Sequence, residues 1–238
     1  MQEDKQQYFP ICLQVAGKPC IVIGGGRVGE RKVQGLVAHG ARVTVISPEL
    51  TPALSAQHRD GQVGWLARSY REGDLAGAFL VIAATDDPVV QQQVHAEAEK
   101  NNTLLNVADV PKWCNFILPA TARQGDLAVS ISTAGKSPAL ARKLRQELEK
   151  QFGPEFAVLV NILGALRDVV MSGPVRRTHE ENKVIFGRLA EIELAVWIRN
   201  GDWERIARHI QEVLGSGVPL DCIEVAREEY KRLSGAAK

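Results

Sequence analysis

The stretch that most constrains the fold of this chain is Cys20–Lys32, which reads CIVIGGGRVGERK. Its first four residues are apolar, glycines follow at positions 24, 25, 26 and 29, and a helix-compatible segment starts at Arg27. A strand, a tight turn and a helix start in direct succession begin a βαβ unit. Gly24, Gly26 and Gly29 fit the pattern G-x-G-x-x-G, whose glycines permit the turn, the approach of a pyrophosphate and close helix–strand packing.

A second apolar segment favours a dinucleotide site over a glycine turn that binds nothing. Ala41–Ile46 reads as the next strand, so that strand, turn, helix and strand fall within about 30 residues. The free N–H groups at the helix start would hold the phosphates. Ser47 stands where an acid for the adenosine ribose often lies, Glu49 is the nearest acid, and no Arg follows the strand to receive a 2′-phosphate. The pattern therefore favours NAD over NADP.

Three further segments predict more strands of the same sheet. In Gln62–Leu66, apolar residues alternate with other residues. Phe79–Ala84 is continuously apolar, as in a strand covered on both faces, and Thr103–Val107 is predicted to be a fifth strand. Helices are expected over residues 51–59 and 88–100, the second one capped by Asp87 ahead of Pro88. Strands that alternate with helices predict an α/β fold of the Rossmann type with a parallel, doubly wound sheet.

The ligand site of such a sheet lies outside the carboxyl ends of its strands. We therefore expect Gly24–Arg27, Ser47, Thr85 and Asp109 to converge on one cleft.

The pattern changes past Pro111. Phe116–Pro119 and Leu127–Ser132 read as two strands joined by Arg123–Asp126, and a helix is expected from Pro138, capped by Ser137, to about residue 152. The segment at 135–137, Gly-Lys-Ser, is not a P-loop, because the required earlier glycine is a serine at position 130. Four basic residues surround the helix start and suit either a substrate with carboxylates or a solvated helix face; they are Lys136, Arg142, Lys143 and Arg145.

The remainder is predicted to be helical. Gly153-Pro154 breaks the chain, and apolar residues then recur every three to four positions at 156–170 and again at Val184, Ile185, Leu189, Ile192 and Val196. His179 and His209 lack metal-ligand partners at suitable spacing and are expected to be structural or surface residues. These patterns divide the chain into a dinucleotide-binding domain (1–112), a segment of two strands and a helix (113–152), and a helical domain (153–238).

Composition excludes several classes of protein. Lys and Arg number 29 against 28 Asp and Glu, so no global charge points to a nucleic acid or membrane partner. No apolar run approaches the roughly 18 residues of a membrane span, and the polar start at residues 1–5 does not resemble a signal peptide, which predicts a cytoplasmic protein. The four cysteines are scattered without a CxxC pair and are expected to be buried thiols.

Six spaced motifs together carry a resemblance to a known family. Their order resembles that of the precorrin-2 dehydrogenase / sirohydrochlorin ferrochelatase family, in the dehydrogenase–chelatase part of sirohaem synthase. The resemblance runs from Phe9 to about Glu149 and does not extend to the helical tail. The motifs are Phe9–Ile11, Gly24–Lys32, Ala83–Asp87, Asn106–Asp109, Phe116–Pro119 and Ser132–Arg142.

The resemblance implies NAD⁺-dependent oxidation of precorrin-2 to sirohydrochlorin, on the route to sirohaem. It implies a homodimer built through the middle α/β segment and, in some members, insertion of Fe²⁺ or Co²⁺ into the product. Asp109 matches the catalytic aspartate of the family, which would accept the proton lost in the oxidation, although Asp after a strand is also common as a cap. No resident metal site is expected, with only Cys114 near Asp109.

The resemblance also implies two sets of binding residues. Thr133 and Ala134 replace a serine and a glycine that are frequent in the family, which leaves the hydroxyl and tightens the loop. The expected substrate-binding residues are Ser132, Thr133, Lys136 and Arg142. The expected cofactor-binding residues are Gly24, Gly25, Gly26, Arg27, Val28, Ser47, Pro48, Ala84, Thr85, Asn106 and Val107.

Two other classes of function stay open from the sequence. An NAD(H)-binding regulator would carry a basic recognition helix or a transport segment beside the sheet, and the tail has neither pattern. Another NAD(P)-dependent reductase of a small acid or imine would place a Lys, His or Tyr at the ends of the later strands, where this chain has Asp109.

Overall fold

The computed structural model describes residues 8–173 and 177–235, which belong to two compact units, Met1–Leu118 and Pro119–Lys238. The polar start at residues 1–5, on which the expectation about a signal peptide rests, lies outside the described residues. None of the described helices is long and apolar enough to cross a membrane. The three-part division expected from the sequence stays a prediction.

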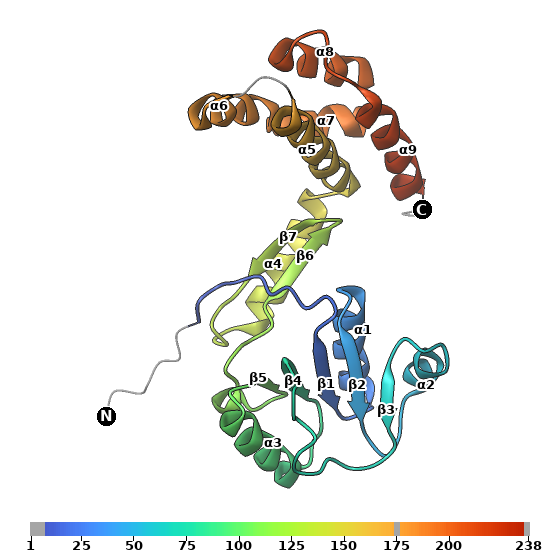
Figure 1. Cartoon of the computed structure of the whole chain (residues 1–238), viewed down its shortest axis with the longest axis vertical. Helices are drawn as coiled ribbons and strands as arrows, with labels where there is room; N and C mark the ends of the chain where they lie inside the picture. The colour runs from blue at the N-terminus through green and yellow to red at the C-terminus, as the bar shows by residue number, and fades with distance from the viewer. Residues whose placement is uncertain (1–7, 174–176, 236–238) are drawn as a thin grey trace, which may run out of the picture. The chain divides into compact units, whose positions relative to one another are not determined.

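The first unit is built on a five-stranded parallel sheet (Figure 1). The strand order is β3-β2-β1-β4-β5, so the chain proceeds outward from β1 in one direction and then returns to its other side at β4. This reversal leaves a crevice at the carboxyl ends of β1 and β4, which is where such sheets bind ligands. The strands are β1 (Pro19–Ile23), β2 (Arg42–Ile46), β3 (Gly64–Leu66), β4 (Leu80–Ala83) and β5 (Leu104–Val107).

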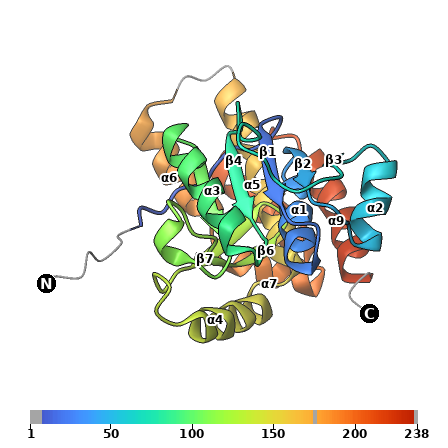
Figure 2. The ribbon, with the colours of Figure 1, turned by 90° about the horizontal axis from the view of Figure 1, so that it is seen from below.

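Helices cover both faces of this sheet, with α1 and α3 to either side of the strands in Figure 2. Val33 of α1 packs in one apolar cluster with Val22 and Ile82, whereas Val94 of α3 packs in a second cluster with Val81. All four residues of β4 are buried, as its continuous apolar run predicted. The helices are α1 (Arg27–Ala38), α2 (Pro52–Arg59) and α3 (Pro88–Lys100). The Rossmann-type α/β prediction is confirmed.

Side-chain caps define where the helices begin. Thr51 Oγ1 accepts a hydrogen bond from the Leu54 N–H at 3.3 Å, and Pro52 follows as the first helical residue of α2. The Asp87 carboxylate accepts from the Val89 N–H at 2.9 Å at the start of α3, again ahead of a proline. Each cap satisfies an N–H that has no partner within the helix. The predicted start of α3 is therefore confirmed.

The connection from β3 to β4 contains no helix and is fastened by a buried carboxylate. Glu97 of α3 accepts hydrogen bonds from the N–H groups of Gly73 and Leu75, both at 3.0 Å, and from the Tyr70 hydroxyl. Burial, followed by the hydrogen bond to Glu97, raises the pKa of Tyr70, so the hydroxyl stays a donor. Three donors on one buried carboxylate tie the loop to α3.

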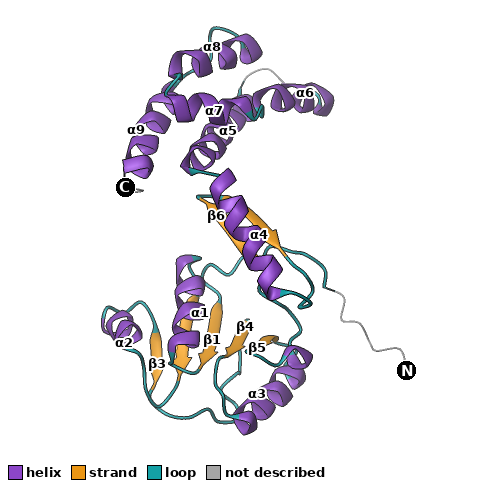
Figure 3. Ribbon diagram, turned by 180° about the vertical axis from the view of Figure 1, so that it is seen from behind, coloured by secondary structure: helices purple, strands orange, loops and turns teal. Residues whose placement is uncertain are grey.

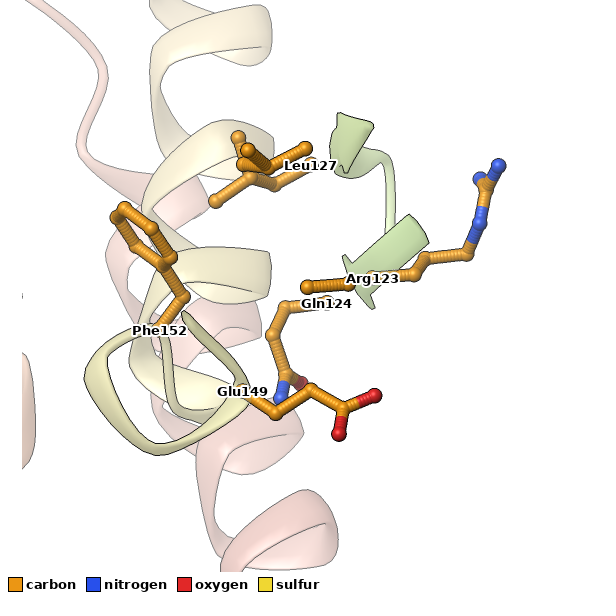
Figure 4. Close-up of a pocket in the computed structure, with 7 residues that line it drawn as sticks. Arg123, Gln124, Leu127, Glu149 and Phe152 are labelled. Atoms are coloured by element: carbon orange, nitrogen blue, oxygen red, sulfur yellow. The ribbon is translucent and has the colours of Figure 1, made fainter. Parts of the chain in front are cut away.

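The second unit begins with a β-hairpin packed against a helix (Figures 3 and 4). Strands β6 (Ala120–Gln124) and β7 (Leu127–Ile131) are antiparallel, and α4 (Pro138–Gln151) is capped by Ser137. The crevice between hairpin and helix has Leu127 and Phe152 among its lining residues, while Arg123 points away from it (Figure 4).

The predicted position of the first strand of this hairpin is wrong. Phe116–Pro119 has no regular structure, and the strand runs through Ala120–Gln124, although the sequence predicts a turn from Arg123 and no element over residues 120–122. Two physical reasons explain the shift. A proline lacks the N–H that a ladder needs, so the strand starts after Pro119, and the two-residue loop at 125–126 needs only Gly125 in the left-handed region, with φ of +55°.

In the part of the second unit that the structure describes, five further helices surround one apolar cluster. Leu159, Ile162 and Leu166 of α5 are buried in this cluster, as their spacing predicted. The second apolar repeat does not form one buried stripe, because α6 ends at Leu189 before α7 begins, and Ile192 is 67% exposed. The helices are α5 (Pro154–Ser172), α6 (His179–Leu189), α7 (Glu193–Asn200), α8 (Trp203–Leu214) and α9 (Asp221–Gly235).

Removal of the Glu97 carboxylate should destabilise the first unit. The variant Glu97→Ala leaves the buried Leu75 N–H, the partly buried Gly73 N–H and the Tyr70 hydroxyl without their acceptor, which should lower the free energy of unfolding by about 3 kcal/mol. Thermal and urea unfolding measure the change. The control is Glu99→Ala on the same helix, whose exposed side chain should change stability by under about 0.5 kcal/mol. Equal stability of the two variants would contradict the role of the carboxylate.

Candidate functional site

The glycine turn after β1 is enclosed by the ends of two neighbouring strands. Gly24 has φ of +105°, and its N–H donates to the Ile46 carbonyl at 2.9 Å. A Cβ at this position would lie 2.4 Å from the Ala84 carbonyl oxygen, and one at Gly25 would lie 2.2 Å from that of Glu49. Side chains are therefore excluded at both positions, and the backbone itself forms the floor of the site.

The next two glycines differ in what surrounds them. A Cβ at Gly29 would meet the Gly24 carbonyl oxygen at 2.0 Å, so α1 packs directly on the turn. A Cβ at Gly26 would meet nothing within 4 Å, and no described side chain caps α1. Gly26, Arg27 and Val28 are exposed at this helix start, and the first N–H groups of a helix have no partner within the helix. Free N–H groups and the positive end of the helix dipole fit a pyrophosphate.

The predicted site residues that directly follow β2 and β4 border the same turn. Ser47 is half-buried, and its Cβ would be 3.1 Å from a Cβ at Gly25. The Thr85 N–H would be 3.2 Å from a Cβ at Gly24, and the Thr85 carbonyl accepts from Gln91 Nε2 at 2.7 Å. Ser47, Ala84 and Thr85 are thus brought to the glycine turn, and Pro48 follows as an exposed residue.

Asp109 lies in a tight turn beyond the carboxyl end of β5. The Ala108 N–H donates to the Ala83 carbonyl at 2.9 Å, which joins this turn to the end of β4. Asp109 is exposed and has φ of +60°, a left-handed conformation that costs most side chains about 1 kcal/mol and that Asp tolerates better than most. In β5 itself, Asn106 Nδ2 donates to the Phe116 carbonyl at 3.1 Å, and Val107 is buried.

Sequence reasoning missed one residue of this region, Lys32. Its ammonium group is half-buried on α1, and its pKa is lowered by burial and by Arg31, while the Asp109 carboxylate acts in the opposite direction. A cation therefore interacts electrostatically with the carboxylate of Asp109. The helical period places position 32 three residues after Gly29, and therefore on the same side of α1, but the proximity of Asp109 depends on tertiary structure.

The expected substrate residues form a loop of the second unit. The Ser132 hydroxyl accepts from the Ala134 N–H at 3.1 Å, and Thr133 Oγ1 accepts from the Ser137 N–H at 3.1 Å. Ala134 has φ of +49°, a conformation that favours glycine. Lys136 and Arg142 are exposed at the start of α4. The hydroxyl groups therefore shape the loop, and the two cations are free to meet an anion.

Among residues 8–173 and 177–235, no group of three or more His, Cys, Asp or Glu side chains could hold a metal ion. His209 Nε2 lies 2.9 Å from the Arg188 carbonyl, and its ring packs edge-on against Trp197. Its contacts are therefore structural, as expected.

Two family models match consecutive parts of the chain. A model described as putative NAD(P)-binding matches residues 11–120, and one described as sirohaem biosynthesis protein central matches residues 124–151. The first covers the sheet and the glycine turn, and the second covers most of the hairpin and α4.

Curated relatives match over most of this chain. A siroheme synthase 1 of Pectobacterium atrosepticum is 37% identical over 201 residues, which are 83% of this chain and 42% of the relative. A siroheme synthase of Edwardsiella ictaluri is 36% identical over 222 residues, which are 92% of this chain and 47% of the relative. The chain thus spans less than half the length of these relatives.

A solved structure shares the fold. The protein described as SirC, precorrin-2 dehydrogenase matches with a TM-score of 0.74 and 22% identity, over 87% of this chain and 98% of the other. The two family models and the relatives together show that this chain is homologous to part of the sirohaem synthases, over an NAD(P)-binding domain and the central sirohaem-biosynthesis region.

Proposed function

We propose that this chain oxidises precorrin-2 to sirohydrochlorin with NAD⁺ in sirohaem biosynthesis. The observation that carries the proposal is the pairing of a side-chain-free dinucleotide notch with a single carboxylate, Asp109, on a turn bonded to the end of β4. The choice of precorrin-2 as the substrate is supported by the names of the siroheme synthase relatives and of SirC, precorrin-2 dehydrogenase. The proposal places the protein in the cytoplasm, where its four free thiols stay reduced.

The cofactor would be held mostly by backbone. The N–H groups of Gly26, Arg27 and Val28 would bind the pyrophosphate, while Ser47 and Pro48 border the side on which the adenosine ribose lies in such folds. Ala84 and Thr85 directly follow β4, and Asn106 and Val107 are the last residues of β5 before Asp109. Bound NAD⁺ supplies the two-electron acceptor of the reaction.

Asp109 would move the proton of the same reaction. The oxidation removes two electrons and two hydrogens from the substrate, one leaving as hydride to the cofactor and one as a proton. The Asp109 carboxylate accepts this proton, as a general base at the edge of the site. The partly buried Lys32 interacts electrostatically with this carboxylate, and the carboxylate acts to raise the pKa of Lys32.

The second unit offers groups that suit a polyanionic substrate. Lys136 and Arg142 are exposed at the start of α4, where the helix dipole also attracts negative charge. We propose that these cations, with the Ser132 and Thr133 hydroxyls, bind carboxylates of the tetrapyrrole.

An anaerobic assay tests the function directly. Purified protein is mixed with precorrin-2 and NAD⁺, and the absorbance of sirohydrochlorin and of NADH is followed, with Fe²⁺ or Co²⁺ added afterwards. We expect one NADH per sirohydrochlorin formed. Loss of sirohydrochlorin absorbance on metal addition would extend the proposal to metal insertion, and absence of NADH with authentic precorrin-2 would overturn it.

A side chain at Gly26 should block the cofactor. A valine there projects into the space beside the free N–H groups, so Gly26→Val should weaken NADH binding at least about tenfold, measured by titration of NADH fluorescence. Gly35→Val on the same helix is the control, because a Cβ there also meets nothing within 4 Å but lies two turns away from the notch. Equal affinity of the two variants would place the dinucleotide elsewhere.

Removal of the Asp109 carboxylate should affect turnover and spare cofactor binding. We expect Asp109→Asn, which keeps the shape and tolerates the left-handed backbone, to lower kcat at least about a hundredfold with unchanged NADH affinity. Asp109→Gly should lose kcat equally and fold at least as stably, because it relieves the positive φ. Wild-type kcat in the Asn variant would identify Asp109 as a turn residue without a catalytic role.

We propose in addition that the chain forms a homodimer through the hairpin and α4. A two-stranded hairpin is only marginally stable by itself, and α4 leaves Leu140 and Leu144 48% and 42% exposed on one face. A second copy of the same surface would cover these side chains.

A charge on this face of α4 should separate the two copies. Leu144→Lys should convert the protein from dimer to monomer at micromolar concentration, measured by light scattering after size exclusion, because the ammonium would be buried without a partner. Val225→Lys on α9 is the control, since that side chain is 69% exposed and lies on another helix. A dimer that survives the first substitution, or a wild-type monomer, would contradict the proposed interface.

A further inference from the structure

The turn that carries Asp109 is weakly closed by its own backbone. The Val110 N–H reaches the Val107 carbonyl at 3.4 Å, near the limit of a hydrogen bond, and Asp109 between them has a positive φ. A turn in this conformation keeps its geometry only if its surroundings determine it.

The thiol of Cys114 lies behind this turn and contacts it at several points. Its sulfur receives the Val107 N–H at 3.2 Å, and the Sγ atom lies 3.3 Å from the Val107 carbonyl oxygen and 3.5 Å from that of Val110. The side-chain amide of Asn106 adds a donor at 3.7 Å. One thiol thus bonds to the residues on both sides of Ala108-Asp109.

The Cys114 backbone is itself held in place. It closes the short 3₁₀ helix η1 (Pro111–Trp113), with the Cys114 N–H donating to the Pro111 carbonyl at 3.0 Å. The next residue, Asn115, pairs with the edge of β5: its Oδ1 accepts from the Leu105 N–H and its Nδ2 donates to the Thr103 carbonyl, both at 2.8 Å. The sulfur is therefore fixed relative to β5 and does not follow the turn.

We propose that Cys114 is a positioning residue, whose thiol holds the 107–110 turn so that the Asp109 carboxylate stays in its working geometry. This inference rests on the proposed function of Asp109 as a proton acceptor. Cys114 itself touches neither substrate nor cofactor in this scheme.

The thiol is suited to this task because it stays protonated. Burial raises the pKa of Cys114, which is 8% exposed, and a neutral thiol can accept from the Val107 N–H while donating to a carbonyl. Alanine at this position removes both interactions. Serine keeps a donor and an acceptor, although its shorter bond to oxygen places them farther from the turn.

Steady-state kinetics of Cys114→Ala and Cys114→Ser provide the first test. We expect Cys114→Ala to lower kcat about tenfold with unchanged KM for NAD⁺, and Cys114→Ser to recover most of that loss. The control is Cys20→Ala, which removes a buried thiol of β1 that makes no contact with this turn and should leave kcat unchanged. Wild-type kcat in Cys114→Ala, with Asp109→Asn inactive, would overturn the inference and leave the proposed function intact.

A double variant separates positioning from a general structural effect. If the thiol acts through Asp109, adding Cys114→Ala to Asp109→Asn should not lower the residual turnover further. A further tenfold loss in the double variant would show that the thiol acts independently of Asp109 and would overturn the proposal.

A measurement that does not depend on enzyme turnover distinguishes failure of this inference from failure of the proposed function. Amide hydrogen exchange at Val107 should accelerate at least about tenfold in Cys114→Ala and return toward the wild-type rate in Cys114→Ser. Unchanged exchange would overturn the positioning role whether or not the protein oxidises precorrin-2. An inactive wild type with the expected exchange rates would instead refute only the catalytic assignment.

Discussion

The structure of the first unit depends on one close contact, that of the start of α1 with the glycine turn. With a Cβ at Gly29 only 2.0 Å from the Gly24 carbonyl oxygen, any other residue there would push the helix away from β1. The helix start would then move relative to the strand ends. Because the same helix start provides the free N–H groups of the notch, the packing of two glycines determines both the sheet-to-helix geometry and the ability to bind a dinucleotide.

The Asp109 carboxylate is positioned by a turn and its neighbours, and not by close backbone packing as in the glycine turn. Asp109 is exposed and strained, and its place comes from a turn bonded on one side to the end of β4 and on the other to Cys114. The cofactor notch is made of backbone and tolerates few substitutions, whereas the proposed catalytic group is one side chain whose turn is supported by its neighbours. A site of this kind can lose turnover without losing its cofactor, because a proton acceptor acts in the reaction step and not in the docking of the dinucleotide.

Sequence reasoning succeeded where a local pattern has one physical interpretation. The fully apolar run of β4, the Asp-Pro and Ser-Pro helix starts and the glycine spacing were all recovered in the structure. It was wrong where the pattern is ambiguous. The polar strand β6 lacks an apolar signature, and the repeat from Val184 to Val196 continues across the break between α6 and α7, since periodicity alone does not mark a helix end.

The amino-acid sequence by itself determined the α/β class, the position of the dinucleotide turn and the assignment of Asp109 to the end of β5, because glycine spacing and strand order act over short distances along the chain. Tertiary structure alone decided that Lys32 interacts with Asp109 and that the Cys114 thiol supports its turn. In the first case, Lys32 on α1 and Asp109 beyond β5 are 77 residues apart in the sequence. In the second, the thiol is aimed by the pairing of Asn115 with the edge of β5, an interaction between segments that no local pattern encodes.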